Sequence, residues 1–176
     1  MEEVVHPFEP VVSEESRILI LGSFPSVRSR ETKFYYGHPR NRFWKMLSEL
    51  LGEAEPGTID EKKSLILRHG LAVWDTLACC EIQGSADASI RREQPNDIPG
   101  LVRKYGIRAI LFNGNASYKY YLKYFKTNPE LGSVILMALP STSPANAAMS
   151  LNRLEEVWGQ ALADLNGRIR RKDAEE

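Results

Sequence analysis

Amides, hydroxyls and one carboxylate follow four short apolar runs in this chain of 176 residues. They occur in Gly22-Ser23, Trp74-Asp75-Thr76, Asn113-Gly114-Asn115 and Pro140-Ser141-Thr142-Ser143. Such groups suit recognition of a neutral, amide-like heterocycle and stabilisation of a developing anion by hydrogen bonds. They do not suit metal chemistry, because His6, His38 and His69 lie far apart and no Cys, His and carboxylate spacing fits zinc. We therefore predict that the protein uses no metal and no other cofactor.

The apolar runs that precede these groups are interpreted as buried strands. They span Arg17–Gly22, Leu71–Asp75, Arg108–Asn113 and Ser133–Leu139. Nearly continuous hydrophobicity over so few residues is typical of parallel strands that are covered on both faces. The carboxyl ends of parallel strands meet at one edge of a sheet, where open α/β sheets bind their ligands. The polar groups are therefore expected to share one crevice.

Helical periodicity occupies most segments between the runs. The expected helices begin near Asn41, Asp60, Asn115 and Asn152, and the last has a capping-box partner in Glu155. Four strand-then-helix units predict an α/β fold, a single three-layer α/β/α sandwich with a central four-stranded parallel sheet. Its length favours one domain over residues 1–176, with peripheral extensions at about 1–14 and 167–176. Arg168 to Glu176 mix charges without apolar periodicity, so they are expected to fray.

Three stretches are predicted to be irregular, namely Ser23–Arg40, Thr76–Pro99 and Pro140–Ser150. Loops of this length in a small protein are usually functional or disordered, and all three follow a strand end. The first of them lacks the Gly-Lys-Ser/Thr ending of a phosphate-binding loop. Convergence on one edge of the sheet favours a functional role for all three.

Positive charge is concentrated in the first of these stretches, although the whole chain has 23 basic and 23 acidic residues. From Arg28 to Lys45 six positive residues face a single acid, Glu31. A short basic segment on a neutral protein suits transient contact with phosphates, although a solvated charged loop would show the same pattern. The predicted phosphate-contacting residues are Arg28, Arg30, Lys33, Arg40 and Arg42.

The overall composition, 43% hydrophobic and 26% charged, is ordinary for a globular protein. No apolar run is long enough to span a membrane, and the acidic amino terminus lacks a signal-peptide hydrophobic region. The two cysteines, Cys79 and Cys80, are adjacent and too few to ligate an iron–sulfur cluster alone. We therefore expect a cytoplasmic protein with reduced thiols and no membrane partner.

Several motifs together resemble the uracil-DNA glycosylase superfamily, in particular its hypoxanthine-DNA glycosylase branch. The anchors, which cover most of the chain, are Leu21–Ser26, Gly37–Trp44, Val73–Leu77, Gly84–Ile90, Phe112–Ala116 and Leu139–Ala147. The resemblance implies a monomer with strand order 2-1-3-4 that flips a damaged base out of DNA and hydrolyses its N-glycosidic bond. The implied substrate is double- or single-stranded DNA carrying a deaminated base. Hypoxanthine is the expected base, and activity on uracil is expected to be weak or absent.

The same resemblance suggests roles for individual residues. In the family, the motif at Gly22–Ser26 usually carries an Asp or Asn that activates water, but Phe24 occupies that place in this chain. The resemblance transfers catalysis to Asn41, in the Asn-Arg-Phe-Trp element. The segment from Pro140 to Asn146 resembles a loop that grips phosphates and wedges the minor groove. It adds Ser141, Ser143 and Asn146 to the predicted DNA contacts.

These positions also have ordinary structural interpretations. Asn41 is a good helix N-cap, a role that is compatible with catalysis. Phe24 could simply pack in the core, or it could stack on a flipped purine. Tyr36 could be ordinary loop packing and His38 a surface histidine. Asp75 and Asn113 could each cap a turn. The predicted substrate-binding set is Gly22, Ser23, Phe24, Tyr36, His38, Asp75 and Asn113.

Three other functions remain as alternatives. One is a uracil- or mismatch-type DNA glycosylase of the same superfamily, and another is a nucleic-acid-binding module without catalysis. The third is a serine hydrolase built from Ser23 or Ser141 with His38 and Asp75. The hydrolase is disfavoured because the chain has no Gly-x-Ser-x-Gly elbow.

Overall fold

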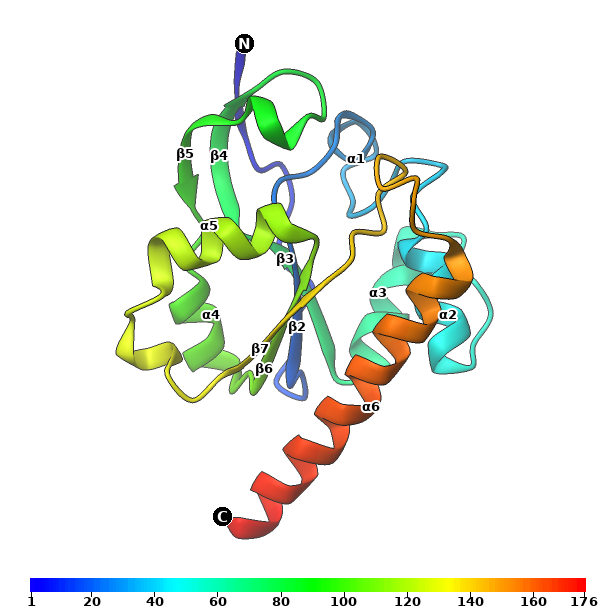
Figure 1. Cartoon of the computed structure of the whole chain (residues 1–176), viewed down its shortest axis with the longest axis vertical. Coiled ribbons are helices and arrows are strands. Elements are labelled where there is room, and N and C mark those ends of the chain that lie inside the picture. Colours follow the sequence, from blue (N-terminus) through cyan, green and yellow to red (C-terminus); the bar gives the residue numbers. More distant parts are fainter.

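The computed structural model describes residues 1–176. Its central parallel sheet consists of β2 (Ile18–Gly22), β3 (Leu71–Asp75), β6 (Ala109–Asn113) and β7 (Ile135–Leu139), in the order β3-β2-β6-β7 (Figure 1). Ile18 lies opposite Leu71 on one neighbour and Ala109 on the other. These strands fall within the four predicted runs, and the predicted order 2-1-3-4 is confirmed.

Both faces of the sheet are covered because its strands are apolar on both sides. In β2, Ile18 and Ile20 belong to one core cluster, whereas Leu19 and Leu21 belong to the other. The first face packs against α2 (Phe43–Leu51), α3 (Ile59–Arg68) and α6 (Leu151–Glu175). The second packs against α4 (Ile98–Tyr105) and α5 (Asn115–Phe125), which lie on the left in Figure 1. The predicted α/β/α sandwich is confirmed.

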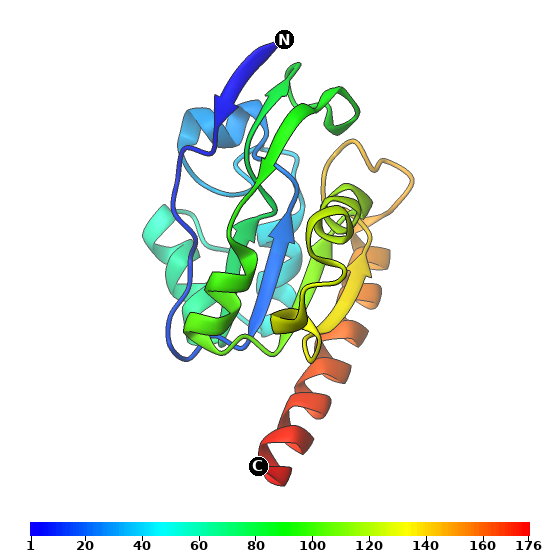
Figure 2. The same cartoon turned by 90° about the vertical axis from the view of Figure 1, so that its left-hand side faces the viewer.

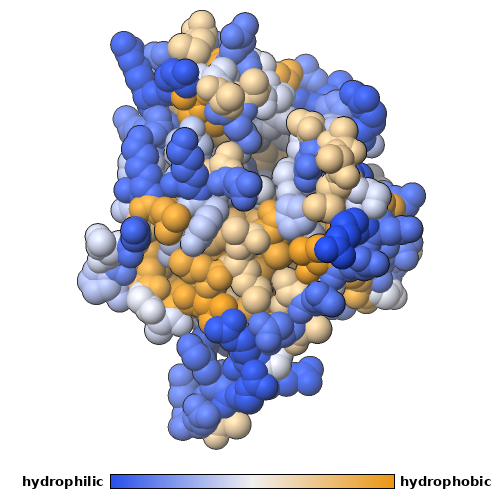
Figure 3. Space-filling model, in the orientation of Figure 1, coloured by the Kyte–Doolittle hydropathy of each residue, from blue (hydrophilic) through white to orange (hydrophobic).

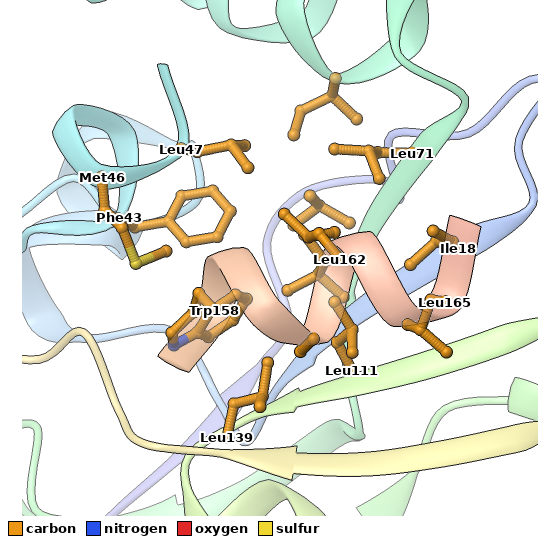
Figure 4. Close-up of a cluster of buried hydrophobic side chains, with 14 of the residues drawn as sticks. Ile18, Phe43, Met46, Leu47, Leu71, Leu111, Leu139, Trp158, Leu162 and Leu165 are labelled. Carbon is orange, nitrogen blue, oxygen red and sulfur yellow. The ribbon is translucent and has the colours of Figure 1, made fainter. Parts of the chain in front are cut away.

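The larger core cluster lies between the sheet and α2, α3 and α6 (Figure 4). The rings of Phe43 and Trp158 meet edge to face there, with centroids 6.3 Å apart. Trp158 also donates its indole N–H to the carbonyl of Pro140 at 3.0 Å. This bond ties the start of the loop after β7 to the core, so α6 helps to place that loop.

A second, antiparallel sheet has the order β1-β4-β5 and stands beside the upper end of the main sheet (Figures 1 and 2). Its strands are β1 (Glu2–Val5), β4 (Leu77–Ile82) and β5 (Arg91–Pro95), with a short 3₁₀ turn, η1 (Asp87–Ser89), before β5. The prediction that Thr76–Pro99 is irregular was therefore wrong. β5 reads Arg-Arg-Glu-Gln-Pro, and its pairing with β4 contains register shifts, so no apolar alternation marks it.

Both ends of the chain, where peripheral extensions were expected at about 1–14 and 167–176, form regular secondary structure, and the end of α6 projects from the body (Figure 1). β1 pairs with β4, and Val11 is buried and bridges to Val73. At the other end, α6 continues to Glu175, and Arg108 forms ion pairs with Asp173 and Glu176 at 3.0 Å each. The expected fraying of Arg168 to Glu176 was therefore wrong.

Helix boundaries differ from the predicted ones where local hydrogen bonding decides the cap. Thr58, rather than Asp60, caps α3 through a capping box with Glu61, and Ser150, rather than Asn152, caps α6. α1 (Val27–Thr32) lies within the stretch Ser23–Arg40, which was wrongly predicted to be irregular throughout. α4 and the short turn η2 (Pro129–Leu131) were not predicted.

Apolar surface on one face of the molecule lies between α5 and α6, where β7 forms the edge of the sheet (Figure 3). Hydrophilic residues cover the protruding end of α6 (Figure 3). None of the helices combines the length and the apolar character that crossing a membrane requires.

Candidate active site

A pocket of about 120 Å³ lies at the carboxyl ends of β2, β3 and β6. Gly22, Asp75 and Asn113 are the last residues of these three strands, so the parallel sheet itself brings them together. The loop after β7 and the hairpin loop between β4 and β5 complete the wall. Its lining residues are Gly22, Ser23, Phe24, Pro25, Ser26, Ser29, Tyr35, Tyr36, Asn41, Asp75, Ser85, Asp87, Asn113, Ser141, Thr142 and Ser143.

Most of the predicted site residues therefore meet in one pocket. His38, Asn146 and the predicted basic residues do not line it. Ser85 and Asp87 were not predicted, although they fall within the Gly84–Ile90 motif of the family resemblance, which could have identified them. His6 was also missed, because a lone histidine in an amino-terminal segment carries no local sequence signal.

The amide oxygen of Asn41 is hydrogen-bonded within the protein, whereas its amide nitrogen is not. Its Oδ1 accepts from the backbone N–H of Phe43 at 3.0 Å and from the hydroxyl of Thr142 at 2.9 Å. Since a backbone N–H can only donate, the orientation of the amide is determined by this contact. The Nδ2 group makes no hydrogen bond within the protein and lies in the wall of the pocket. Asn41 thus supports the start of α2 and still offers two donors to a ligand.

Asn113 holds the loop after β7 against the end of β6. Its Nδ2 donates to the hydroxyl of Thr142 and its Oδ1 accepts from the Thr142 backbone N–H, both at 3.0 Å. Thr142 is fully buried between the two asparagines. The three side chains therefore form one network, in which Thr142 connects Asn113 to Asn41.

Arg42 holds the loop after β7 in place through hydrogen bonds to its backbone carbonyl oxygens. Its guanidinium donates to the carbonyl oxygens of Ser143 at 2.9 Å and Asn146 at 3.1 Å, and also to that of Met149. A further contact reaches the carbonyl of Thr142 at 3.4 Å. Because its donors are used within the protein, this geometry favours a supporting role for Arg42 over direct phosphate contact. Asn146 is also engaged, since its Nδ2 donates to the Ser141 carbonyl at 3.0 Å.

Asp75 is paired with His6 at the base of the pocket. Asp75 Oδ2 lies 2.7 Å from His6 Nε2, and both side chains are only 5% exposed. The second oxygen, Oδ1, lies against Gly22, where a Cβ atom would overlap it. Glycine is needed here because of this close approach, so Gly22 and Asp75 form one packed unit of the wall.

Two tyrosines flank this unit. Burial, reinforced by the negative charge of Asp75, raises the pKa of both Tyr35 and Tyr36 far above the usual value, so both phenols stay neutral. Tyr35 donates its hydroxyl to the Glu9 carbonyl at 2.8 Å. The buried hydroxyl of Tyr36 has no hydrogen-bond partner. Buried polar groups are rarely left unpaired, and the side chain of Asn113 lies close enough to influence this hydroxyl.

The hairpin loop between β4 and β5 closes the pocket from the opposite side. Asp87 accepts from the Ser23 hydroxyl at 2.7 Å, and Ser85 accepts from the backbone N–H of Val27 at 2.9 Å. The protein packed around the Asp87 carboxyl raises its pKa, and the charge of Asp75 adds to this effect. Phe24 packs beneath this loop against Leu77. Phe24 is thus both a core residue and part of the wall.

The remaining basic residues of the Arg28–Lys45 segment lie around the pocket. Arg28 is paired with Glu31 at 3.1 Å, and both side chains are more than half exposed. Arg30 donates to the carbonyls of Pro25 and Gly84. Arg40 and Lys33 are exposed, whereas the ring of His38 accepts from the Arg40 backbone N–H at 3.1 Å. Of the predicted phosphate-contacting residues, Arg28, Lys33 and Arg40 are therefore the ones that are open to an incoming phosphate.

Comparison with known proteins agrees with this geometry. A family model of the Uracil DNA glycosylase superfamily matches residues 9–165. The chain belongs to this superfamily. Gly22, Asn41 and Ser141, which come from three of the motifs that suggested the superfamily from sequence, line the pocket. The predicted family is thus confirmed.

Within the glycosylase superfamily, the chain is similar to two archaeal proteins named Hypoxanthine DNA glycosylase. The protein from Methanosarcina acetivorans is 36% identical over 155 residues, which cover 86% of this chain and 93% of the relative. The protein from Methanosarcina barkeri is 33% identical over 115 residues, or 64% of this chain and 73% of the relative.

A solution NMR structure of a Methanosarcina acetivorans protein assigned to the uracil DNA glycosylases has a similar fold. The TM-score is 0.73 at 32% identity, and the match covers 90% of this chain and 96% of that one. The two proteins thus share their fold over nearly their whole length.

Proposed function

We propose that the chain is a monofunctional DNA glycosylase of base-excision repair that releases hypoxanthine from deoxyinosine in DNA. The observation that carries this proposal is the free Nδ2 group of Asn41 in the same pocket as the paired carboxyl of Asp75. A donor and an acceptor are thereby offered to one base. The similar archaeal proteins, both named Hypoxanthine DNA glycosylase, support this substrate.

Hypoxanthine and adenine differ in the groups that such a pocket would contact. Hypoxanthine presents an N1–H donor and an O6 acceptor, whereas adenine presents an N1 acceptor and an N6 amino donor. The Asp75 carboxyl can accept from N1–H, while the Asn41 amide can donate to O6 or a ring nitrogen. A flipped adenine would place an acceptor against Asp75 at N1 and a donor against Asn41 at its 6-amino group.

Hydrolysis needs no group beyond the protein and water in this scheme. As the bond between C1′ and N9 breaks, its electron pair moves onto the purine, and the Asn41 Nδ2–H group stabilises the developing anion. Water adds to the cationic C1′, and its proton finally neutralises the base. The products are free hypoxanthine and an abasic site.

The damaged strand would lie over the pocket mouth, with Arg28, Lys33 and Arg40 on one side. The Ser141–Asn146 loop would contact the backbone on the other, supported from below by Arg42. We further propose that the protein acts as a cytoplasmic monomer, with residues 1–176 forming a single glycosylase-like domain. Either duplex or single-stranded DNA would fit an open mouth of this kind.

A panel of oligonucleotides, each carrying one deaminated base, tests the substrate. We expect abasic product from deoxyinosine and little or none from deoxyuridine, because the predicted contacts read a purine edge. Base release is measured by alkaline cleavage of the product strand under single-turnover conditions. Robust uracil release without hypoxanthine release would instead favour the uracil- or mismatch-type alternative, and binding without any product would favour a non-catalytic module.

The double substitution Arg28→Gln with Arg40→Gln should weaken binding to every DNA sequence. Each lost phosphate contact lowers the slope of log Kd against log salt by roughly 0.9 on duplex DNA, so we expect a decrease of about 2. The control is Arg170→Gln with Arg171→Gln, which changes the net charge equally on the exposed end of α6. An unchanged slope in the first variant would place the DNA elsewhere on the surface.

A further inference from the structure

His6 reaches the active site from the segment that follows β1, and the reaction proposed above gives it no role. Its Nδ1 lies 2.8 Å from the carbonyl oxygen of Phe8, and its Nε2 lies 2.7 Å from Asp75 Oδ2. A carbonyl oxygen can only accept, so Nδ1 carries a proton. The short contact between Nε2 and Oδ2 also needs one proton. The pair therefore holds that proton either as an imidazolium with a carboxylate or as a neutral imidazole with a carboxylic acid.

Both arrangements leave Asp75 Oδ1 as an acceptor. In the first, Oδ1 belongs to a carboxylate; in the second, the acid proton sits on Oδ2 and Oδ1 is the carbonyl oxygen. Oδ1 packs against Gly22 in the pocket wall, so it is the oxygen left for a bound base. His6 thus determines which kind of hydrogen-bonding group the pocket presents at this point.

The surroundings keep this proton within the pair. The His6 ring is enclosed by the rings of Phe8, Phe24 and Tyr35, with centroids 4.7, 6.1 and 5.9 Å away. The titratable groups that face the pair are Tyr35, Tyr36, Asp87 and, beyond Tyr35, Glu9. The two phenols are neutral, and His6 is the only basic side chain that pairs with Asp75.

We propose that His6 is a positioning residue that keeps Asp75 Oδ1 an acceptor, so that the N1–H of hypoxanthine is bound and the N1 acceptor of adenine is rejected. This inference rests on the proposed function. It makes the amino-terminal segment part of base selection, because the segment supplies the partner of the base-reading carboxyl. Without His6, a protonated Asp75 could donate from either oxygen, and the distinction between the two purines would weaken.

The test compares deoxyinosine with its 1-deaza analogue in wild type and three histidine variants. In this analogue C–H replaces N1–H, and the ring proton of the 6-oxo form moves to N3, a change that is the same for every variant. Single-turnover rates are measured between pH 5 and 9. For wild type, loss of N1–H should slow release about 10-fold, the effect of one hydrogen bond to a charged acceptor. In His6→Phe, release of hypoxanthine should fall about 10-fold, the analogue penalty should nearly vanish, and the acid limb of the pH profile should move to higher pH.

Two variants separate positioning from packing. His6→Gln can still donate an amide N–H to Asp75, so it should recover most of the analogue penalty. His69→Phe removes the other histidine–carboxylate pair, with Glu53 at 3.3 Å, which is outside the pocket, and should behave as wild type. Melting temperatures are measured for all variants. If His6→Phe does not fold, His6→Gln and the loss of the wild-type penalty along the acid limb decide the question.

The experiment distinguishes failure of the proposed function from failure of the role proposed for His6. Wild type that does not release hypoxanthine overturns the proposed function and this inference together. Wild type that is active, beside a folded His6→Phe with an unchanged rate, pH profile and analogue penalty, overturns only the role of His6. A wild-type analogue penalty that persists unchanged through the acid limb has the same consequence.

Discussion

Replacing Asn41 with alanine is expected to slow single-turnover release of hypoxanthine by about 100- to 1,000-fold, with lesion-DNA binding largely intact. Loss of one preorganised donor to a developing anion typically costs ~2.7–4 kcal/mol of transition-state stabilisation. The group concerned is the amide Nδ2, because Oδ1 is already bound to Phe43 and Thr142. Alanine should also lower the free energy of unfolding by roughly 1 kcal/mol through loss of the contact with Phe43.

The matched variant is Asn41→Asp, which retains an oxygen acceptor for Phe43 and Thr142, loses the donor and adds a negative charge that also opposes the developing anion. It should melt near the wild-type temperature yet be about as slow as the alanine variant. Melting temperature and single-turnover rate are measured on the same preparation. An aspartate variant that cleaves as fast as wild type would show that the residue acts through an oxygen, by orienting water. The N-cap position of α2 is Arg42 and not Asn41 as predicted, so an alanine variant that melts early but cleaves normally would leave Asn41 only its supporting contact with Phe43.

Replacing Gly22 with alanine is the second change with a large expected effect. The new Cβ would overlap Asp75 Oδ1 and come within 3.3 Å of the Tyr36 hydroxyl. Asp75 would have to move, and displacement of a substrate-positioning group by about 1 Å can cost roughly 100-fold in rate. Overpacking at this site should also lower the free energy of unfolding by about 1–3 kcal/mol.

The control for this change is Gly167→Ala in α6, where an added Cβ meets no atom within 4 Å. That variant should be as active as wild type and more stable by roughly 0.5–1 kcal/mol, because glycine is unfavourable inside a helix. Rates and chemical denaturation curves are compared for the two variants. Normal turnover by a folded Gly22→Ala protein would mean that the Asp75 carboxyl need not hold its observed position.

The main sheet could be predicted because its strands carry their signal locally. Runs such as Ile18–Gly22 and Ala109–Asn113 are apolar on both faces, which is typical of strands in a parallel sheet that is covered on both sides. The second sheet could not be predicted in this way. β5 is a polar edge strand with a shifted register, and β1 pairs with a segment more than seventy residues away in the chain. The second sheet depends on packing in the folded chain, and no pattern within β1 or β5 marks it.

The amino-acid sequence by itself determined the chemical inventory of the site and its common edge, since Gly22, Asp75 and Asn113 end parallel strands. Only the tertiary structure decided what each group can do. Asn41 has a free donor because Thr142, 101 residues away, occupies its oxygen, and Asp75 has only Oδ1 left because His6, 69 residues away, occupies Oδ2. The residue type determines which hydrogen bonds a side chain can make. Which of them remain for a ligand depends on partners that folding brings from distant parts of the chain.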